Sequence, residues 1–245
     1  MTRSFTLFSL THFTAIFIVT ALIAMAILRL RKRAPSLNED RFNHWLGVLV
    51  ISNAVFWNVV AIRGGYFTID DDLPFHLCDI SPYLIAAYLW KPRQSLFDIL
   101  FYWTLAGATL ALILPDLTAG YPSSEFSGFF IAHGLPLFAI LHLILVQGVR
   151  PSRKSVMTAF IALNLYALFI AAPVDLLVGG NYVYLRSVPL VDFNPINLLP
   201  PWPWYIPIID LFALVLFHAM YQLFHLLAGK EETTGLLTHS GTSHR

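Results

Sequence analysis

Charge is what this sequence has least of. Only 12% of its 245 residues are Asp, Glu, Lys or Arg, whereas 57% are hydrophobic. A soluble domain typically carries about 25% charged residues, so the composition excludes an ordinary soluble protein and places the chain in a lipid bilayer. The formal net charge of +1 also leaves no basic face of the kind that a nucleic-acid-binding protein needs.

Cysteine is almost absent as well. Cys78 is the only one, which excludes an internal disulfide and a cysteine-rich zinc site. Lysine is missing from the last apolar segment, residues 204–227. A retinal pump, which needs a lysine there for its Schiff base, is therefore disfavoured.

Long apolar runs are what the chain does have. Crossing roughly 30 Å of hydrocarbon takes about 20 apolar residues, and seven segments approach that length: 8–28, 44–62, 73–90, 96–114, 126–146, 156–178 and 204–227. We therefore predict an all-α, polytopic membrane helical bundle of about seven transmembrane helices. Residues 1–228 form this single domain, and the polar residues 229–245 form a disordered tail. Basic residues follow the first segment, which indicates an uncleaved span rather than a signal peptide.

The basic residues fall mainly on one side of these segments. Twelve of the 15 Lys and Arg lie in the loops of one side, and the other side has only Arg3, Arg63 and Arg186. Positive loops stay in the cytoplasm. We therefore predict a multi-pass protein of the cell membrane, with its N-terminus outside and its C-terminus in the cytoplasm.

The third segment opens with a stretch rich in reactive groups. Residues 73–82 read Leu-Pro-Phe-His-Leu-Cys-Asp-Ile-Ser-Pro. His76 and Asp79 are three positions apart, so on a helix they share a face and can pair, with Asp79 orienting His76. Cys78 lies about 200° around a regular helix from His76. His76 is therefore a poor base for this thiol.

A histidine from another helix fits better. At about 1.5 Å per residue, four polar residues fall in one layer roughly 7–10 Å below the outer surface: Asn58, Cys78, His133 and Asp210. Polar groups inside a membrane meet one another or line a wet cavity. A Cys78 beside His133 would be a usable nucleophile.

Six short motifs suggest a family. In chain order they are Leu-Pro-Phe-His-Leu-Cys-Asp (73–79), Leu-Ile-Leu-Pro-Asp (112–116), Phe-Phe-Ile-Ala-His-Gly (129–134), Gly-Val-Arg-Pro-Ser (148–152), Asn-Tyr-Val-Tyr-Leu (181–185) and Pro-Trp-Pro-Trp-Tyr (201–205). Together they resemble the YwaF and transmembrane protein 164 family, over roughly the second to seventh segments. The resemblance implies an acyltransferase that moves a fatty acyl chain between phospholipids through a Cys–His pair. The pair falls on Cys78 and His133.

The leading hypothesis is therefore a membrane-embedded lipid acyltransferase. Cys78 would form a thioester with the acyl chain of a phospholipid, with His133 as general base, and a lysophospholipid alcohol would accept the chain. If water enters, the same pair gives a lipid hydrolase. A second class of function is a transporter or receptor with an outward-facing polar pocket, which Asn58 and Asp210 favour.

Structural roles remain open for most of these residues. A lone Cys in a membrane helix can be a small apolar filler, and the His76–Asp79 pair can be purely structural. Asp210 could cap the last helix. Arg63 and Arg186 could hold a phosphate head group or lie in water. A metal site of His76, Asp79 and His133 has no recognised spacing, so we expect no metal and no cofactor.

Overall fold

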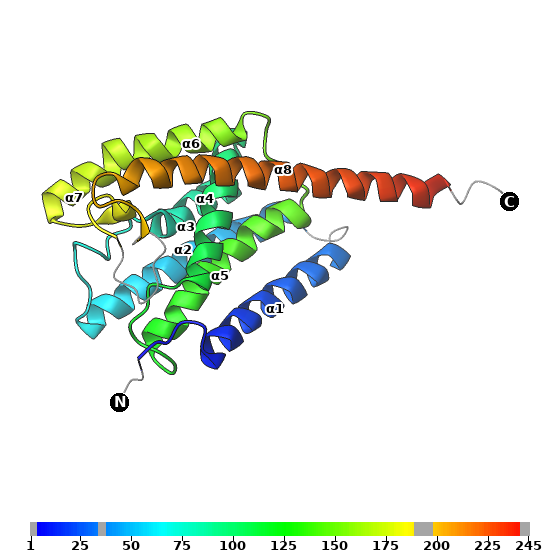
Figure 1. Ribbon diagram of the computed structural model, residues 1–245. Helices are drawn as coiled ribbons and strands as arrows, with labels where there is room; N and C mark the ends of the chain where they lie inside the picture. The colour runs from blue at the N-terminus through cyan, green and yellow to red at the C-terminus, as the bar shows by residue number, and fades with distance from the viewer. Residues whose placement is uncertain (1–3, 34–37, 189–197, 241–245) are drawn as a thin grey trace.

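The computed structural model describes residues 4–33, 38–188 and 198–240, with side chains as far as residue 228. Within these residues the secondary structure is helical, apart from an isolated bridge between Ser4 and Ala119 (Figure 1). The predicted all-helical fold is confirmed.

In the part of the chain that the structure describes, six helical segments are long and apolar enough to cross a membrane. They are α1 (Leu10–Arg33), α2 (Glu39–Gly64), α4 (Gln94–Ile113), α5 (Ser124–Leu145), the continuous segment Ser155–Val178, and α8 (Tyr205–Ser240) as far as Ala228. The fifth of these consists of α6 (Ser155–Tyr166), a π-helical turn η2 (Ala167–Ala171) and α7 (Ala172–Val178). The chain is therefore a multi-pass membrane protein by the length and composition of its helices.

Helix α3 (Leu77–Trp90) is shorter than the segment 73–90 that the sequence suggested. Its 14 residues extend about 21 Å, less than the roughly 30 Å of a bilayer core. A residue that precedes proline avoids helical geometry, and Leu73 precedes Pro74. His76 is also extended, with φ −68° and ψ 150°, and acts as the N-cap residue. The helix consequently begins only at Leu77.

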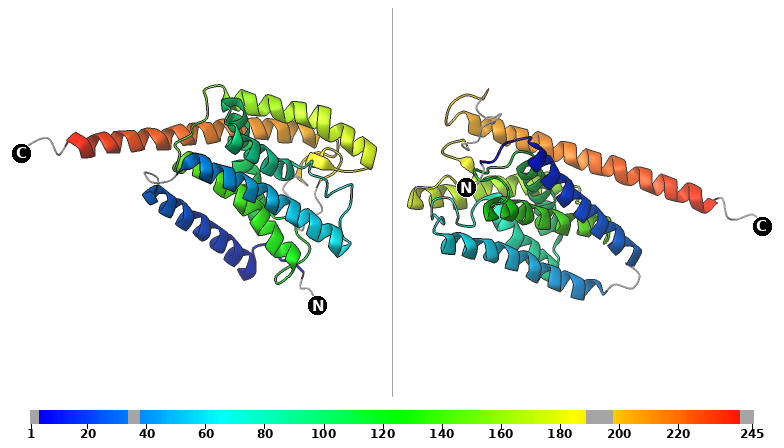
Figure 2. Two further views of the ribbon diagram at one scale, coloured as in Figure 1. Left: turned by 180° about the vertical axis from the view of Figure 1, so that it is seen from behind. Right: turned by 90° about the horizontal axis from the view of Figure 1, so that it is seen from below.

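Helix α5 lies at the centre of the bundle. It contacts α1, α2, α3 and α4, whereas α8 packs mainly on α6 and α6 packs on α4 (Figures 1 and 2). The buried share of the apolar stretch is 50% in α4 and 56% in α5 but only 6% in α8. The core therefore sits around α4 and α5, and α8 is a peripheral helix.

Helices α1, α3, α5 and α8 begin at one end of the bundle, which we call the Cys78 end (Figure 1). Helix α8 finishes at the opposite end.

Helix α8 continues for 36 residues, about 54 Å, so 229–240 are helical where we expected disorder; residues 241–245 lie outside the described part of the chain. The π-helical turn Ala167–Ala171 accommodates one residue more than an α-helical turn. Beyond it, Asp175 is directed inward and is only 1% exposed.

Candidate functional site

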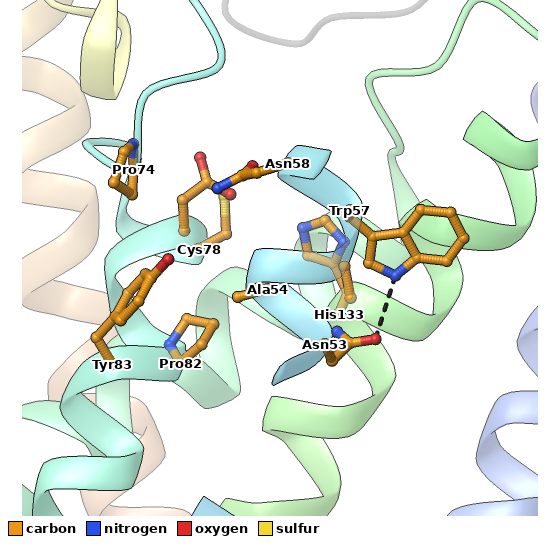
Figure 3. Close-up of a pocket in the computed structure, with 11 residues that line it drawn as sticks. Asn53, Ala54, Trp57, Asn58, Pro74, Cys78, Pro82, Tyr83 and His133 are labelled. Carbon is orange, nitrogen blue, oxygen red and sulfur yellow. Dashed lines mark hydrogen bonds between the residues drawn. The ribbon is translucent and has the colours of Figure 1, made fainter. Parts of the chain in front are cut away.

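A small cavity lies between α2, α3 and α5, near the Cys78 end (Figure 3). Its volume is about 80 Å³, which is room for a few water molecules. Cys78 lines it together with polar and aromatic side chains from all three helices: Asn53, Trp57, Asn58, Asp79, Tyr83 and His133. Three of the four residues that the sequence put at one depth, Asn58, Cys78 and His133, thus lie around one cavity.

His133 is held with one ring nitrogen available. Its Nδ1 lies 2.8 Å from the carbonyl oxygen of Phe129, one helical turn earlier. A carbonyl only accepts, so Nδ1 carries the hydrogen. The Phe129 ring also packs on the imidazole, with 4.1 Å between ring centroids. In the neutral ring, Nε2 therefore carries the lone pair, as a general base requires.

Cys78 is the second residue of α3, not a residue in the middle of a span. A helix N-terminus favours negative charge, although the Asp79 N–H of this first turn already donates to the His76 carbonyl at 3.0 Å. The carboxylate of Asp79 also interacts with the thiol and opposes a second negative charge. Both burial and the Asp79 carboxylate therefore oppose the thiolate, and the helix N-terminus favours it.

Trp57 forms a fixed wall of the cavity. Its indole Nε1 donates a hydrogen bond to Asn53 Oδ1 at 3.1 Å, drawn as the dashed line in Figure 3. The indole also lies against Gly128 of α5, where an added Cβ would come within 2.7 Å of the ring. A glycine at 128 therefore lets α2 and α5 approach closely, and the approach fixes the position of Trp57.

Two prolines leave backbone acceptors at the cavity. Pro82 in α3 and Pro136 in α5 lie inside their helices. A proline has no N–H, so the carbonyl four residues earlier loses its helical partner. The carbonyls concerned belong to Cys78 and Ala132, and both residues line the cavity. In α3 and in α5, one carbonyl near Cys78 and His133 thus lacks the N–H donor that a regular helix would supply.

Residues from α6 and from the loop after α7 position the start of α3. The buried Tyr182 donates a hydrogen bond from its hydroxyl to the Ile69 carbonyl at 2.9 Å and accepts one from the Leu73 N–H at 3.1 Å. The Tyr166 hydroxyl donates to the Phe75 carbonyl at 2.8 Å. The motif at 181–185 therefore contacts the chain just before the motif at 73–79.

His76 fits between the rings of Tyr182 and Tyr184, whose centroids lie 5.1 and 5.2 Å from its own. Val183 and Tyr184 have φ values of 58° and 56°, a left-handed conformation that costs energy in residues other than glycine. This strained turn brings both aromatic rings, and the Val183 N–H at 3.4 Å, onto His76.

The expected pairing of His76 with Asp79 is wrong. His76 Nε2 instead donates to Asp71 Oδ1 at 3.4 Å. The spacing argument assumed a helix through residue 76, but His76 is extended and precedes the first turn. Its side chain therefore points back toward the loop that contains Asp71 rather than along the helix toward Asp79.

The pKa values of this pair shift in opposite directions. Burial alone would lower the pKa of His76, but the hydrogen bond to Asp71 and the charges of Asp79, Asp71 and Asp175 outweigh burial and raise it above 6.5. The hydrogen bond from His76 lowers the pKa of Asp71 below 3.8, although burial opposes it. His76 therefore stabilises the fold fully below pH 6.5, and its contribution is lost as pH rises through the higher folded-state pKa. The stabilisation from Asp71 is fully present above pH 3.8 and is lost as the pH falls through its lower folded-state pKa.

Replacing Asp71 with Asn should therefore lower the Tm most between pH 3.8 and 6.5. Asp71 is largely exposed, so we expect a difference of at most about 3 °C, which disappears once the pH is above the raised pKa of folded His76. Thermal unfolding in detergent across this pH range measures it. Asp70→Asn removes the same charge from the same loop and is the matched control. A Tm difference that persists unchanged at high pH would contradict the assignment to His76.

Three other predicted residues lie outside the cavity. Asp210 of α8 accepts a hydrogen bond from Asn164 of α6 at 3.0 Å, so depth alone placed it wrongly with Cys78. Arg186 donates to the carbonyls of Asp175 and Gly180 at 3.3 and 3.1 Å and thereby supports the loop after α7. Arg63 is exposed in the last turn of α2.

Sequence reasoning also missed Asp98, a buried carboxylate at the end of the bundle opposite the Cys78 end. Asp98 is 3% exposed and accepts hydrogen bonds from the Ser152 N–H at 2.8 Å, the Ser152 hydroxyl at 2.6 Å and the Gln94 amide at 2.8 Å. These bonds fix the turn between α5 and α6. The Gly-Val-Arg-Pro-Ser motif, which ends at Ser152, was the available signal.

Among the described residues, no group of three or more His, Cys, Asp or Glu side chains is arranged to hold a metal ion. His76 is occupied with Asp71 and does not line the cavity with Asp79 and His133. The chemistry of the site therefore has to be argued from the side chains themselves.

Comparison with known proteins agrees with this arrangement of motifs. The model of the TMEM164 family matches residues 7–221. The chain belongs to the TMEM164 family. The TMEM164 match runs from just before α1 well into α8 and includes every residue that lines the cavity.

A curated protein of Treponema pallidum (strain Nichols), described as "Uncharacterized protein", is 29% identical over 127 residues. The aligned region is 49% of this chain and 50% of the relative, so the chain spans about half the length of the protein it matches. No solved structure matches the chain.

Proposed function

We propose that this TMEM164-family protein is a membrane-embedded acyltransferase that moves a fatty acyl chain between phospholipids. One observation carries the proposal. Cys78 and His133 come from different helices and line the same cavity, and the hydrogen bond to Phe129 leaves His133 Nε2 as the basic nitrogen. A nucleophile beside an oriented base is the minimal apparatus for acyl transfer.

The reaction would proceed in two halves. His133 Nε2 takes the proton of the Cys78 thiol, and the sulfur attacks the ester carbonyl of a phospholipid. The bond from that carbonyl to the glycerol oxygen breaks, the leaving alcohol receives the proton from His133, and a thioester remains on Cys78. In the second half, a lysophospholipid hydroxyl gives its proton to His133 and attacks the thioester, which releases the thiol and the new ester.

The surroundings of the cavity support a lipid substrate. Trp57 lines the cavity, and neighbouring residues of α2 are exposed on the outer surface of the bundle, among them Val55, Phe56 and Val59. In a bilayer this face of α2 meets lipid. The ester group of a phospholipid is then separated from the cavity by α2 alone. The cavity itself holds a few waters at most, which favours transfer over hydrolysis. Water that reaches the thioester would make the same pair a lipid hydrolase.

The alternative of a polar transport pocket loses one of its two supports. Asp210 was the ionisable group that favoured it, and Asp210 is bonded to Asn164 between α6 and α8. The polar groups that do meet surround a thiol and an imidazole. We therefore favour chemistry at Cys78 over transport.

The test is an acyl-enzyme trap. Purified protein is incubated with a phospholipid that carries a labelled acyl chain, then denatured and treated with hydroxylamine. We expect a protein-bound label that hydroxylamine removes, because thioesters are cleaved by it, and that is absent in Cys78→Ser. A protein that folds and binds lipid but never carries the label would refute the thioester mechanism.

The orientation in the cell membrane is a further part of the proposal. With the N-terminus outside, the Cys78 end of the bundle faces outward and α8 ends in the cytoplasm. A reporter fused after Arg245 should then be cytoplasmic, and one inserted after Gly180 should be outside. Reporters found on the same side would mean that α3 does not complete a crossing.

A further inference from the structure

Acyl transfer creates a charge that Cys78 and His133 do not stabilise. When the sulfur adds to an ester carbonyl, the electron pair of the C=O bond moves to the oxygen and leaves a negative charge there. Enzymes hold this oxyanion with preorganised hydrogen-bond donors, each worth about 10²–10³ in rate. His133 cannot serve, because its Nδ1–H is bound to Phe129 and its Nε2 takes the thiol proton.

Two donors at the cavity have no partner. Asn58 of α2 and Tyr83 of α3 both line it, and neither side chain makes a hydrogen bond to any residue that the structure describes. Their polar atoms are not sealed in the interior either, since buried side-chain atoms without a partner lie elsewhere, on Thr104, His142 and Asp175. The amide and the hydroxyl are therefore open to the cavity.

Tyr83 lines the same cavity as Cys78, toward the start of α3. Side chains on a helix lean toward its N-terminus and cover the preceding turn, and Tyr83 comes five residues after Cys78. Figure 3 shows the hydroxyl of Tyr83 directed toward the start of α3, with Asn58 approaching Cys78 from the α2 side. In a cavity of about 80 Å³, a carbonyl bound at the sulfur lies close to every wall.

We propose that the Tyr83 hydroxyl and the Asn58 amide form the oxyanion hole of this site. As the sulfur adds, the carbonyl oxygen accepts one hydrogen bond from each. Both bonds persist until the C=O bond re-forms and the glycerol oxygen departs with the proton from His133. Asn53, the other cavity amide, accepts a hydrogen bond from Trp57 through its oxygen.

The inference rests on the proposed function, and two electrophiles separate them. Iodoacetamide alkylates a thiol by displacing iodide from a tetrahedral carbon and forms no oxyanion. A p-nitrophenyl ester with a short acyl chain acylates the same thiol through an oxyanion and releases coloured nitrophenolate. The ratio of the two rate constants at Cys78, the only thiol, isolates oxyanion stabilisation from nucleophilicity.

For Tyr83→Phe and for Asn58→Leu we expect acylation to slow by about 10–10³-fold while alkylation keeps the parent rate. The unchanged alkylation also shows that each variant is folded around its cavity. Tyr88→Phe is the matched control, because Tyr88 lies on the same helix and does not line the cavity; both of its rates should equal those of the parent.

Each other outcome is decisive. If Tyr83→Phe and Asn58→Leu are acylated at the parent rate, or if alkylation slows equally, the two residues are not oxyanion donors, and the Cys–His mechanism is untouched. If the parent protein is alkylated but never acylated, the proposed function itself is wrong.

Discussion

Cys78→Ala, His133→Ala and the double variant should all retain the same low residual transfer activity. A nucleophile and its base act as one unit, so removing either should cost about 10²–10⁴ in kcat/KM and removing both should cost no more. The measurement is the rate of labelled acyl transfer from phospholipid to lysophospholipid in detergent or liposomes.

His218→Ala is the control for loss of an imidazole, because His218 is exposed on α8, away from the cavity; it should keep the parent activity. If Cys78→Ala is folded and fully active, no thioester forms. If the double variant instead shows the product of two independent losses, Cys78 and His133 do not act together.

Tyr182→Phe should give the second large effect, on stability. The Tyr182 hydroxyl satisfies the Ile69 carbonyl and the Leu73 N–H and is the main tie between the loop after α7 and the chain before α3. Its removal leaves both backbone groups unpaired and should cost about 1–3 kcal/mol, or roughly 3–10 °C in Tm. Alkylation of Cys78 should become faster, because the start of α3 is held less firmly.

Tyr66→Phe provides the comparison. Tyr66 lies between α2 and α3, in the segment that Tyr182 holds, and is exposed, so the Tm and the alkylation rate of Tyr66→Phe should match those of the parent. A Tyr182→Phe protein with normal stability would mean that Tyr166 and the aromatic contacts at His76 suffice to hold the loop.

Depth along a helix could be predicted from the sequence, but direction around it could not. Counting residues put Asn58, Cys78, His133 and Asp210 in one layer, and the structure places the first three at one cavity. Asp210 is at the wrong position around the bundle, because α8 packs on α6 rather than on α3 or α5. Only the order of helices in space decides such a case, and apolar run lengths carry no information about it.

Helix starts were the second source of error. The length of the apolar run 73–90 predicts a helix throughout, although Pro74 lies near its start. The actual start at Leu77 changes the partner of His76 and moves Cys78 to a helix N-terminus. Tyr83 was missed for a related reason: the lean of a side chain toward the helix start brings it to the cavity that Cys78 lines, although their positions on a helical projection differ.

The π-helical turn Ala167–Ala171 has a consequence for how this segment can change. Successive residues of an α-helix are rotated by about 100° around its axis. The wider π turn, which holds one extra residue, therefore sets the direction in which the side chains after it face. The wide turn absorbs its extra residue, and Asp175 binds the Tyr182 N–H. Tightening the same residues into a regular α-helix would turn Asp175 by about 100°, away from that N–H. Exchanging one apolar side chain there for another would leave this direction intact. The contact between Asp175 and Tyr182 therefore depends on the width of this turn more than on which apolar side chains it carries.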